Sequence, residues 1–275
     1  MSFAQRPLWS WSSARSAVIA VAASAALAGC AVLFSSADAP VARRVAALLP
    51  VDALLIGEQH DAAAHHAAER EAVEALAQRG RLAALAIEMA EEGNASGHLP
   101  ADATEAQVKT ALGWNDKAWP WASYGPIVMA AVRAGVPVVG ANLPRERMKD
   151  AMADVSLDVQ LPPEAWRAQQ EAVRDGHCKL LPESQILPMT RIQVARDRAM
   201  AQAIVKARQP GKTVLLVSGA GHATKPLGVP QHLPTDVTVK SVALQAGDGP
   251  DRPGYDAIWR TPAMPEKGYC ASLRK

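Results

Sequence analysis

The sequence of 275 residues lacks several features that would assign it to a common functional class. It has no uninterrupted apolar run near the roughly 20 residues that a membrane-spanning helix needs. It also lacks clusters of lysine and arginine, and its formal net charge is only +2. A nucleic-acid-binding surface depends on such clusters, so no nucleic-acid partner is predicted. Phenylalanine, tyrosine and tryptophan make up only 4% of the chain, which makes any local concentration of aromatics informative.

The first thirty residues resemble a bacterial lipoprotein signal peptide. Arg6 and Arg15 give a positive start, residues 17–26 form a short apolar run, and residues 27–30 read Leu-Ala-Gly-Cys. Small residues before the cut suit the peptidase, and the thiol of Cys30 accepts the lipid that anchors the mature chain. We therefore predict a signal peptide over residues 1–29, cleaved before Cys30, and a tether over residues 30–41.

The mature chain has the size and charge of one neutral globular domain. Removal of the signal peptide takes away two arginines and no acidic residue, which leaves 27 basic residues against 27 acidic ones. The remaining 246 residues lie within the range of a single α/β domain. We assign this domain to residues 42–275. Because Ala31 follows the lipidated cysteine and is not an acidic retention signal, we expect the anchor in the outer membrane, with the domain facing the periplasm.

Apolar runs alternate with helical patterns along the domain. This alternation predicts an α/β fold with a mostly parallel central sheet flanked by helices. The expected strands are residues 52–57, 82–89, 136–140, 213–217 and 237–244, with an edge strand at 255–260. The expected helices include residues 62–79, 126–133, 146–153, 163–174 and 187–207.

Polar side chains follow several of these strands. Glu58 and His60 come after the first strand, Glu88 ends the second, and His222 comes after the fourth. Ligands of open α/β sheets bind outside the carboxyl ends of the strands, so we expect these four side chains to lie together. Two imidazoles with a carboxylate match a divalent-metal site formed by His60, Glu88 and His222, or an acid/base pair. A single G-x-x-H sequence could instead be a turn, but two copies favour a site.

Other polar and aromatic residues support fewer conclusions. His65 and His66, on the helix after the first strand, are expected on a solvated face. Cys178 and Cys270 could form a disulfide in an oxidising compartment, or could be two unrelated buried thiols. Four of the nine aromatics of the mature chain lie within eleven residues, and this cluster suggests an apolar wall for a flat ligand. Its members are Trp114, Trp119, Trp121 and Tyr124.

Taken in order, these motifs resemble the ChaN-like haem-binding lipoproteins, which belong to the wider Tiki/TraB grouping with paired G-x-x-H motifs. The segment LLIGEQHD…HH…E…LAIEM covers residues 54–89, and Tyr-Gly-Pro-Ile follows at 124–127 with Asn-Leu-Pro at 142–144. His-Cys at 177–178, Arg-Asp at 196–197, Gly-Ala-Gly-His at 219–222 and Gly-Val-Pro at 228–230 complete the series. The resemblance covers roughly residues 50–245.

The resemblance implies a membrane-anchored protein on the periplasmic side that binds haem and takes part in haem or iron uptake. It also implies homodimers that enclose haem, and an outer-membrane receptor is a further candidate partner. Haem-binding residues are then expected among Trp119, Trp121, Tyr124, His60 and His222, with Tyr124 as the candidate iron ligand. The alternative is a metal-dependent hydrolase, similar to Tiki proteins or erythromycin esterases. It would use Glu58, His60, Glu88 and His222 around a divalent metal. The aromatic cluster near Tyr124 favours haem binding, whereas the paired G-x-x-H sequences by themselves favour the metal site, and a binding protein is expected rather than an enzyme.

Overall fold

The computed structural model describes residues 39–265 and 267–273 of the chain. The predicted signal peptide, the lipidated Cys30 and most of the tether lie outside these residues. In the part of the chain that is described, no helix combines the length and the hydropathy needed to cross a membrane.

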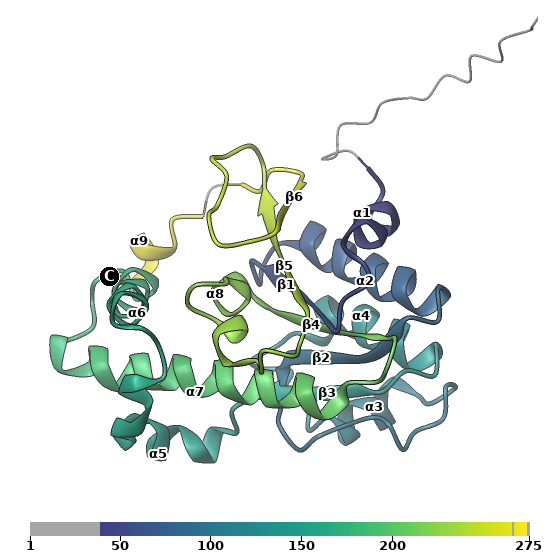
Figure 1. The fold of residues 1–275 in the computed structure, drawn as a ribbon, viewed down its shortest axis with the longest axis horizontal. Coiled ribbons are helices and arrows are strands. Elements are labelled where there is room, and N and C mark those ends of the chain that lie inside the picture. Colours follow the sequence, from purple (N-terminus) through teal and green to yellow (C-terminus); the bar gives the residue numbers. More distant parts are fainter. Residues whose placement is uncertain (1–38, 266, 274–275) are drawn as a thin grey trace, which may run out of the picture. The chain divides into compact units, whose positions relative to one another are not determined.

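A six-stranded parallel sheet forms the centre of the domain (Figure 1). The strands run side by side in the order β3-β2-β4-β1-β5-β6, and every neighbouring pair is parallel. They are β1 (Ala53–Glu58), β2 (Leu82–Glu91), β3 (Val138–Asn142), β4 (Thr213–Gly219), β5 (Val239–Ala246) and β6 (Ala257–Thr261). The predicted α/β class with a mostly parallel sheet is confirmed, and so is the edge strand near the C-terminus.

Helices cover both faces of this sheet. The α-helices are α1 (Val41–Leu48), α2 (Ala63–Gln78), α3 (Glu105–Ala111), α4 (Trp121–Arg133), α5 (Met148–Ala153), α6 (Pro163–Gly176), α7 (Glu183–Ala207), α8 (Ala220–Ala223) and α9 (Tyr269–Leu273). Three short 3-10 helices are η1 (Arg145–Arg147), η2 (Val155–Val159) and η3 (Val229–His232). In Figure 1, α7 runs along the side of the sheet opposite to α2.

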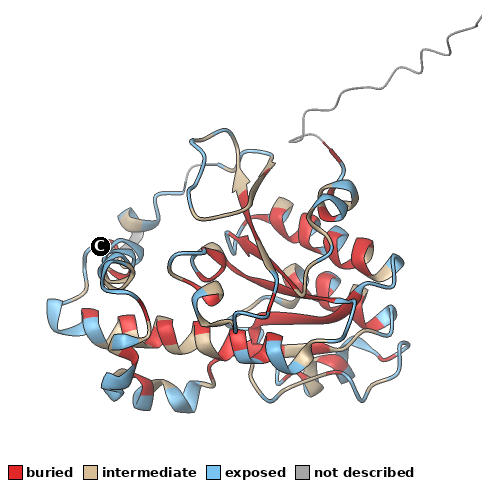
Figure 2. Ribbon diagram, in the orientation of Figure 1, coloured by how far each residue is buried: buried red, intermediate tan, exposed pale blue. Residues whose placement is uncertain are grey.

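Side chains of successive strand residues enter two different cores. In β1, Leu54 and Ile56 pack with α1, α2 and α4, whereas Ala53 and Leu55 pack against Met200 and other residues of α7. This alternation follows from the strand geometry, in which neighbouring side chains point to opposite faces. Figure 2 shows the central strands β1, β2 and β4 red over most of their length, as expected for strands buried on both faces of a sheet.

Two helices begin earlier than the sequence predicts. α4 begins at Trp121 rather than at residue 126, and α7 begins at Glu183 rather than at residue 187. A proline, Pro126 or Pro188, lies inside each of these helices. The buried residues of each helix explain the difference, because their packing outweighs the single hydrogen bond that a proline removes. Tyr124 therefore lies on a helix.

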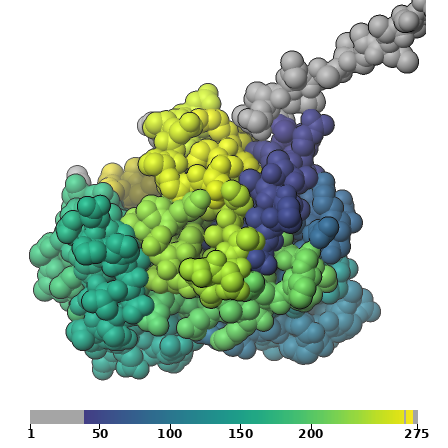
Figure 3. Space-filling model, viewed as in Figure 1, coloured from purple at the N-terminus to yellow at the C-terminus, as the bar shows by residue number. Residues whose placement is uncertain are grey.

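The C-terminal segments complete the fold at the β6 edge. In the space-filling view they form the yellow surface between the purple α1 and the teal α6 (Figure 3). A disulfide joins Cys178, just after α6, to Cys270 on α9, with a Cα–Cα distance of 5.4 Å. Of the two possibilities that the sequence leaves open for these cysteines, the structure thus shows the disulfide.

Candidate functional site

The order of the strands brings three polar strand ends together. β1 and β4 are neighbours, with Glu58 level with Gly219, and β2 lies on the other side of β4. The pairing of β2 with β3 is irregular between Ile87 and Glu91, so Glu88 lies where the strand deviates from regular pairing. Irregular pairing of this kind often redirects a side chain near a functional site. Glu58 and Glu88 consequently lie at the same carboxyl edge.

Glu58 is a buried carboxylate that connects three side chains. Its Oε1 accepts hydrogen bonds from the Tyr124 hydroxyl and from His60 Nδ1, each at 2.8 Å. Its Oε2 lies 3.0 Å from His66 Nε2. Burial alone would raise the pKa of Glu58, but the hydrogen bonds from the two histidines outweigh burial and lower it. Glu58 is therefore an anion that orients its neighbours.

His222 is held between two buried acids. Its Nδ1 lies 2.7 Å from Asp197 Oδ1, and its Nε2 lies 3.6 Å from Glu88 Oε1. Burial opposes charge on His222, yet these two carboxylates raise its pKa to about 10. Burial raises the pKa of Asp197 to about 6, so at neutral pH the pair consists of an imidazolium and a carboxylate. For Glu88, burial is outweighed by His222 and His60, which lower its pKa to about 2.

The structure brings His60, Glu88 and His222 together, as the sequence predicts. Besides the His222 contact, Glu88 Oε2 lies 3.9 Å from His60 Nε2 and accepts the backbone N–H of Gly219 at 2.8 Å. The two imidazoles thus approach the two oxygens of one carboxylate. Within residues 39–265 and 267–273, no group of three or more His, Cys, Asp or Glu side chains is placed to hold a metal ion. The role of these residues as metal ligands stays a prediction.

His60 and His222 differ in their access to solvent. The side chain of His60 is 41% exposed, whereas that of His222 is 11% exposed. Burial lowers the pKa of His60, but the Glu58 hydrogen bond and the charge of Glu88 outweigh it, so the net shift is upward. His60 is therefore the imidazole of the cluster that an incoming ligand can reach.

The predicted aromatic cluster divides between two environments. Trp119 packs edge-on against His60 and Tyr124, with ring centroids 4.9 and 5.8 Å apart. Trp121 instead lies against α3, where its Nε1 donates to Glu105 Oε2 at 2.8 Å. Tyr124 is buried, and the Glu58 carboxylate beside its hydroxyl adds to the effect of burial in raising its pKa. Of these three residues, Trp119 is the one placed to form a wall beside the polar cluster.

A pocket of about 410 Å³ opens beside this cluster. Glu88 and Trp119 line it together with Asn142, Leu143, Arg145, Met148 and Arg196, among others. Its volume falls within the roughly 300–1,000 Å³ typical of small-molecule sites. Apolar side chains such as Trp119, Leu143 and Met148 alternate in its lining with polar and charged ones, so the pocket is more polar than most small-molecule sites.

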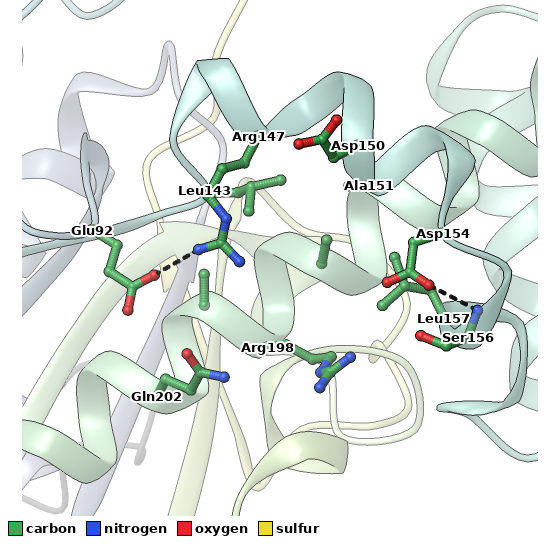
Figure 4. A pocket seen from close by; sticks show the side chains of 12 residues that line it. Glu92, Leu143, Arg147, Asp150, Ala151, Asp154, Ser156, Leu157, Arg198 and Gln202 are labelled. Carbon is green, nitrogen blue, oxygen red and sulfur yellow. Dashed lines mark hydrogen bonds and ion pairs between the residues drawn. The ribbon is translucent and has the colours of Figure 1, made fainter.

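A second pocket of about 500 Å³ lies next to the first, with Leu143 lining both. Its walls come from η1, α5, η2 and α7, and Figure 4 shows Arg147, Asp150, Asp154 and Arg198 around it. Although it is somewhat larger, it contains none of the strand-end residues. We therefore place the candidate site in the pocket beside Glu88.

The expectation of a solvated face for His65 and His66 is wrong. Both are buried, because the start of α2 passes beside the end of β1. His65 Nδ1 accepts the backbone N–H of Gln59 at 3.0 Å, and burial lowers the His65 pKa to about 4. Glu69, on the same helix, is fully buried next to Glu58, and burial raises its pKa well above the usual value. The spacing of His65, His66 and Glu69 along the helix was the sequence feature that could have indicated this buried polar group.

Asp197 and Arg196 are further site residues to which the sequence assigned no role. They lie on α7, and Asp197 contacts His222 although 25 residues separate the two along the chain. In the sequence, the only feature that could have indicated a role for Arg196 and Asp197 was their place in the Arg-Asp motif at residues 196–197.

Comparisons with known proteins agree with the fold. A family model described as "Haem-binding uptake, Tiki superfamily, ChaN" matches residues 44–233. The structure of ChaN from Campylobacter jejuni, described as showing cofacial haem binding, is similar with a TM-score of 0.64 and 23% sequence identity. The match covers 76% of this chain and 87% of that chain.

A solved structure with lower similarity is that of the type III effector HopBA1, with a TM-score of 0.46 and 15% identity over 82% of this chain and 94% of that chain. Its TM-score is too low to support a conclusion. A search of curated protein sequences finds no significant match.

Proposed function

The chain belongs to the ChaN family of haem-binding uptake proteins in the Tiki superfamily, and we propose that it binds haem at the carboxyl edge of its sheet. The observation that carries this proposal is the pocket beside Glu88, where Trp119 forms an aromatic wall next to the exposed imidazole of His60. Flat aromatic ligands gain most of their affinity from such walls, and an imidazole is a common haem ligand.

His60 is the residue that we propose as the iron ligand. Its Nδ1 is bonded to the Glu58 carboxylate at 2.8 Å, which leaves Nε2 as the nitrogen for a metal. Metal-binding histidines commonly donate their other ring nitrogen to a carboxylate in this way. Bound haem would supply the iron centre that the His60 imidazole would ligate.

Tyr124, the ligand candidate chosen from the sequence, occupies a less favourable position for this role. Tyrosine binds haem iron through its oxygen, and the Tyr124 oxygen donates to Glu58 in a buried position. Its raised pKa also opposes loss of the hydroxyl proton. We assign Tyr124 to the support of Glu58 and thereby of His60.

The cellular setting remains part of the proposal. The lipobox at residues 27–30 supports a lipid anchor at Cys30, with the domain on the periplasmic side of the outer membrane. The family supports a part in haem or iron uptake, in which an outer-membrane receptor could deliver the ligand. The cofacial haem binding described for Campylobacter jejuni ChaN supports the proposal that this chain forms a homodimer when it binds haem.

Titration of the 31–275 domain with haemin tests the proposal. We expect a saturable, red-shifted Soret band. A Trp119→Ala variant should bind about tenfold more weakly, which corresponds to ~1.4 kcal/mol. The matched control is Trp121→Ala, since Trp121 lies near Trp119 along the chain but packs against α3. A spectrum without saturation, or equal losses in both variants, would count against this site.

A metal-dependent hydrolase is the second candidate function. It is favoured by the symmetry of the two histidines, each with a carboxylate at Nδ1 and with Nε2 towards Glu88. A metal held there would activate water, with Glu58 or Glu88 as the base. Measurement of metal content in the purified domain, compared with His60→Ala and His222→Ala, tests this candidate. Stoichiometric metal that both variants lose would support it, and metal-free protein would argue against it.

A further inference from the structure

Besides the aromatic wall formed by Trp119, the candidate pocket is lined by polar side chains. Arg145 comes from η1, directly after β3, and Arg196 comes from α7. Both line the pocket together with Asn142, the last residue of β3. Arg145 is exposed, whereas Asn142 is more than nine-tenths buried. The pocket is therefore lined by two cationic side chains and a buried amide, together with the carboxylates of Glu88 and Glu91.

Two of these groups lack partners. Within the described residues, Arg196 Nε and Asn142 Oδ1 are buried atoms that have no hydrogen-bond partner. Native proteins rarely leave such atoms unsatisfied, because a buried donor or acceptor loses its bonds to water. Since both residues line the pocket, an acceptor group of a ligand can bind the Arg196 Nε–H, whereas Asn142 Oδ1 needs a donor.

The nearby carboxylates already have other contacts. Glu88 and Asp197 both face the His222 imidazolium. Glu91 Oε1 accepts the backbone N–H of Arg145 at 3.1 Å. His222 carries one positive charge, and Arg196 also lowers the pKa of Asp197 through its own charge, so these two cations together offset part of the negative charge of the acids. A guanidinium presents several donors that suit a carboxylate, and it forms stronger hydrogen bonds to an anion than to a neutral group.

We infer that Arg145 and Arg196 bind carboxylate groups of the ligand. This inference rests on the proposed function and names its substrate class as tetrapyrroles with free propionate side chains. In that arrangement Trp119 lies against the macrocycle and the two arginines meet its propionate edge. Recognition of the propionates does not involve iron, so a metal-free porphyrin binds as well.

Protoporphyrin IX and its dimethyl ester separate this interaction from iron ligation. Both compounds have the same macrocycle and no metal, but the ester has no carboxylate charge. Binding to the 31–275 domain is measured through porphyrin fluorescence and quenching of tryptophan emission. We expect the ester to bind the wild-type protein at least about tenfold more weakly than the diacid.

Three substitutions complete the experiment. Arg145→Gln and Arg196→Gln should each reduce the preference for the diacid, and the two together should bring the affinity ratio close to one. Arg198→Gln is the matched control, because Arg198 lies on the same helix but lines the neighbouring pocket (Figure 4). If Arg196→Gln does not fold, the exposed Arg145→Gln still tests the inference.

The outcomes distinguish this inference from the proposed function. Equal affinity of wild-type protein for diacid and ester, or an unchanged ratio in Arg145→Gln, would overturn the role of the arginines. Haemin could still bind in that case, and the proposed function would stand. Selective binding of the diacid without saturable binding of haemin would support the arginines and contradict the haem proposal.

Discussion

The two G-x-x-H sequences of the chain have the same spacing but lead to different environments. After Gly57, the chain makes a turn before α2, and His60 lies in that turn with its side chain 41% exposed. After Gly219, the chain enters α8 directly, and His222 lies on this short helix with its side chain only 11% exposed. One motif therefore presents an imidazole to a ligand, and the other places one inside the protein.

The buried acids near each histidine explain this difference. His60 has one close hydrogen-bonding carboxylate, Glu58, which also serves Tyr124 and His66. His222 lies between Asp197 and Glu88 and is held as a buried cation. A buried ion pair is destabilising when one partner is lost, because the other charge remains without compensation. We therefore assign ligand binding to His60 and a structural role to His222.

Removal of Asp197 should have the largest effect on stability. Asp197→Ala leaves the imidazolium of His222 with only the more distant Glu88, and we expect a loss of about 3–5 kcal/mol in the free energy of unfolding. Urea denaturation measures this change. The control is His60→Ala, which should cost only about 1 kcal/mol because His60 is partly exposed. Similar losses in the two variants would remove the distinction between the motifs.

Loss of the disulfide should affect the motif that contains His60 more than the motif that contains His222. Tyr269 of α9 donates to Asp61 Oδ2 at 2.6 Å, one residue after His60, and Cys270 fixes that helix. The bond joins residues 92 positions apart, so a Cys178→Ser/Cys270→Ser variant should lose about 2–4 kcal/mol of stability. Histidine NMR signals of His60 should shift, while those of His222 stay constant. Unchanged stability and unchanged signals would contradict this prediction.

The glycines of the two motifs can be compared directly. A Cβ at Gly57 would lie 2.7 Å from the backbone Cα of Ala220, so Gly57→Ala should destabilise the fold by about 1–3 kcal/mol. A Cβ at Gly221 would have no atom within 4 Å among its described surroundings, so Gly221→Ala should change stability by less than about 0.5 kcal/mol. Thermal or urea unfolding of both variants measures the difference. Equal effects of the two substitutions on stability would show that the close approach of β1 to α8 does not restrict the side chain at position 57.

The charge on His222 predicts a dependence of stability on pH. Its pKa is raised from 6.5 to about 10, so its contribution is complete below pH 6.5 and is lost as the pH rises towards 10. Between pH 7.5 and 8.5 the wild-type protein should lose about 1 kcal/mol of stability per pH unit. A His222→Gln variant should show a smaller slope. His65, with a pKa of about 4, is neutral throughout this interval and adds nothing. A slope unaffected by the substitution would contradict a charged His222.

The sequence was sufficient to predict the sheet and the convergence of Glu58, Glu88 and the two motif histidines. Apolar runs define parallel strands, and parallel strands place their carboxyl ends on one edge, so local patterns carried this information. The strand order was not predicted, because it depends on contacts between residues far apart in the chain. The burial of His65 and His66 and the contact of Asp197 with His222 were missed for the same reason.

The cluster of aromatics shows where a local pattern stops being informative. Its members are close together in sequence, and this proximity predicted a single apolar wall. Trp119 precedes α4 and reaches His60, whereas Trp121 is the first residue of α4 and turns towards α3. The predicted start of α4 at residue 126 also left Trp121 outside the helix, whereas α4 begins at Trp121. The roles of Trp119 and Trp121 could therefore not be distinguished from the sequence.

The most direct test of the proposed haem site is the Soret spectrum of the haemin complex in wild-type protein, His60→Ala and Tyr124→Phe. Ligation by the exposed imidazole predicts that His60→Ala changes the position or intensity of the band, while Tyr124→Phe leaves its position unchanged. The reverse result, with an altered band in Tyr124→Phe and a normal one in His60→Ala, would contradict the assignment of His60 and identify the buried tyrosine as the ligand.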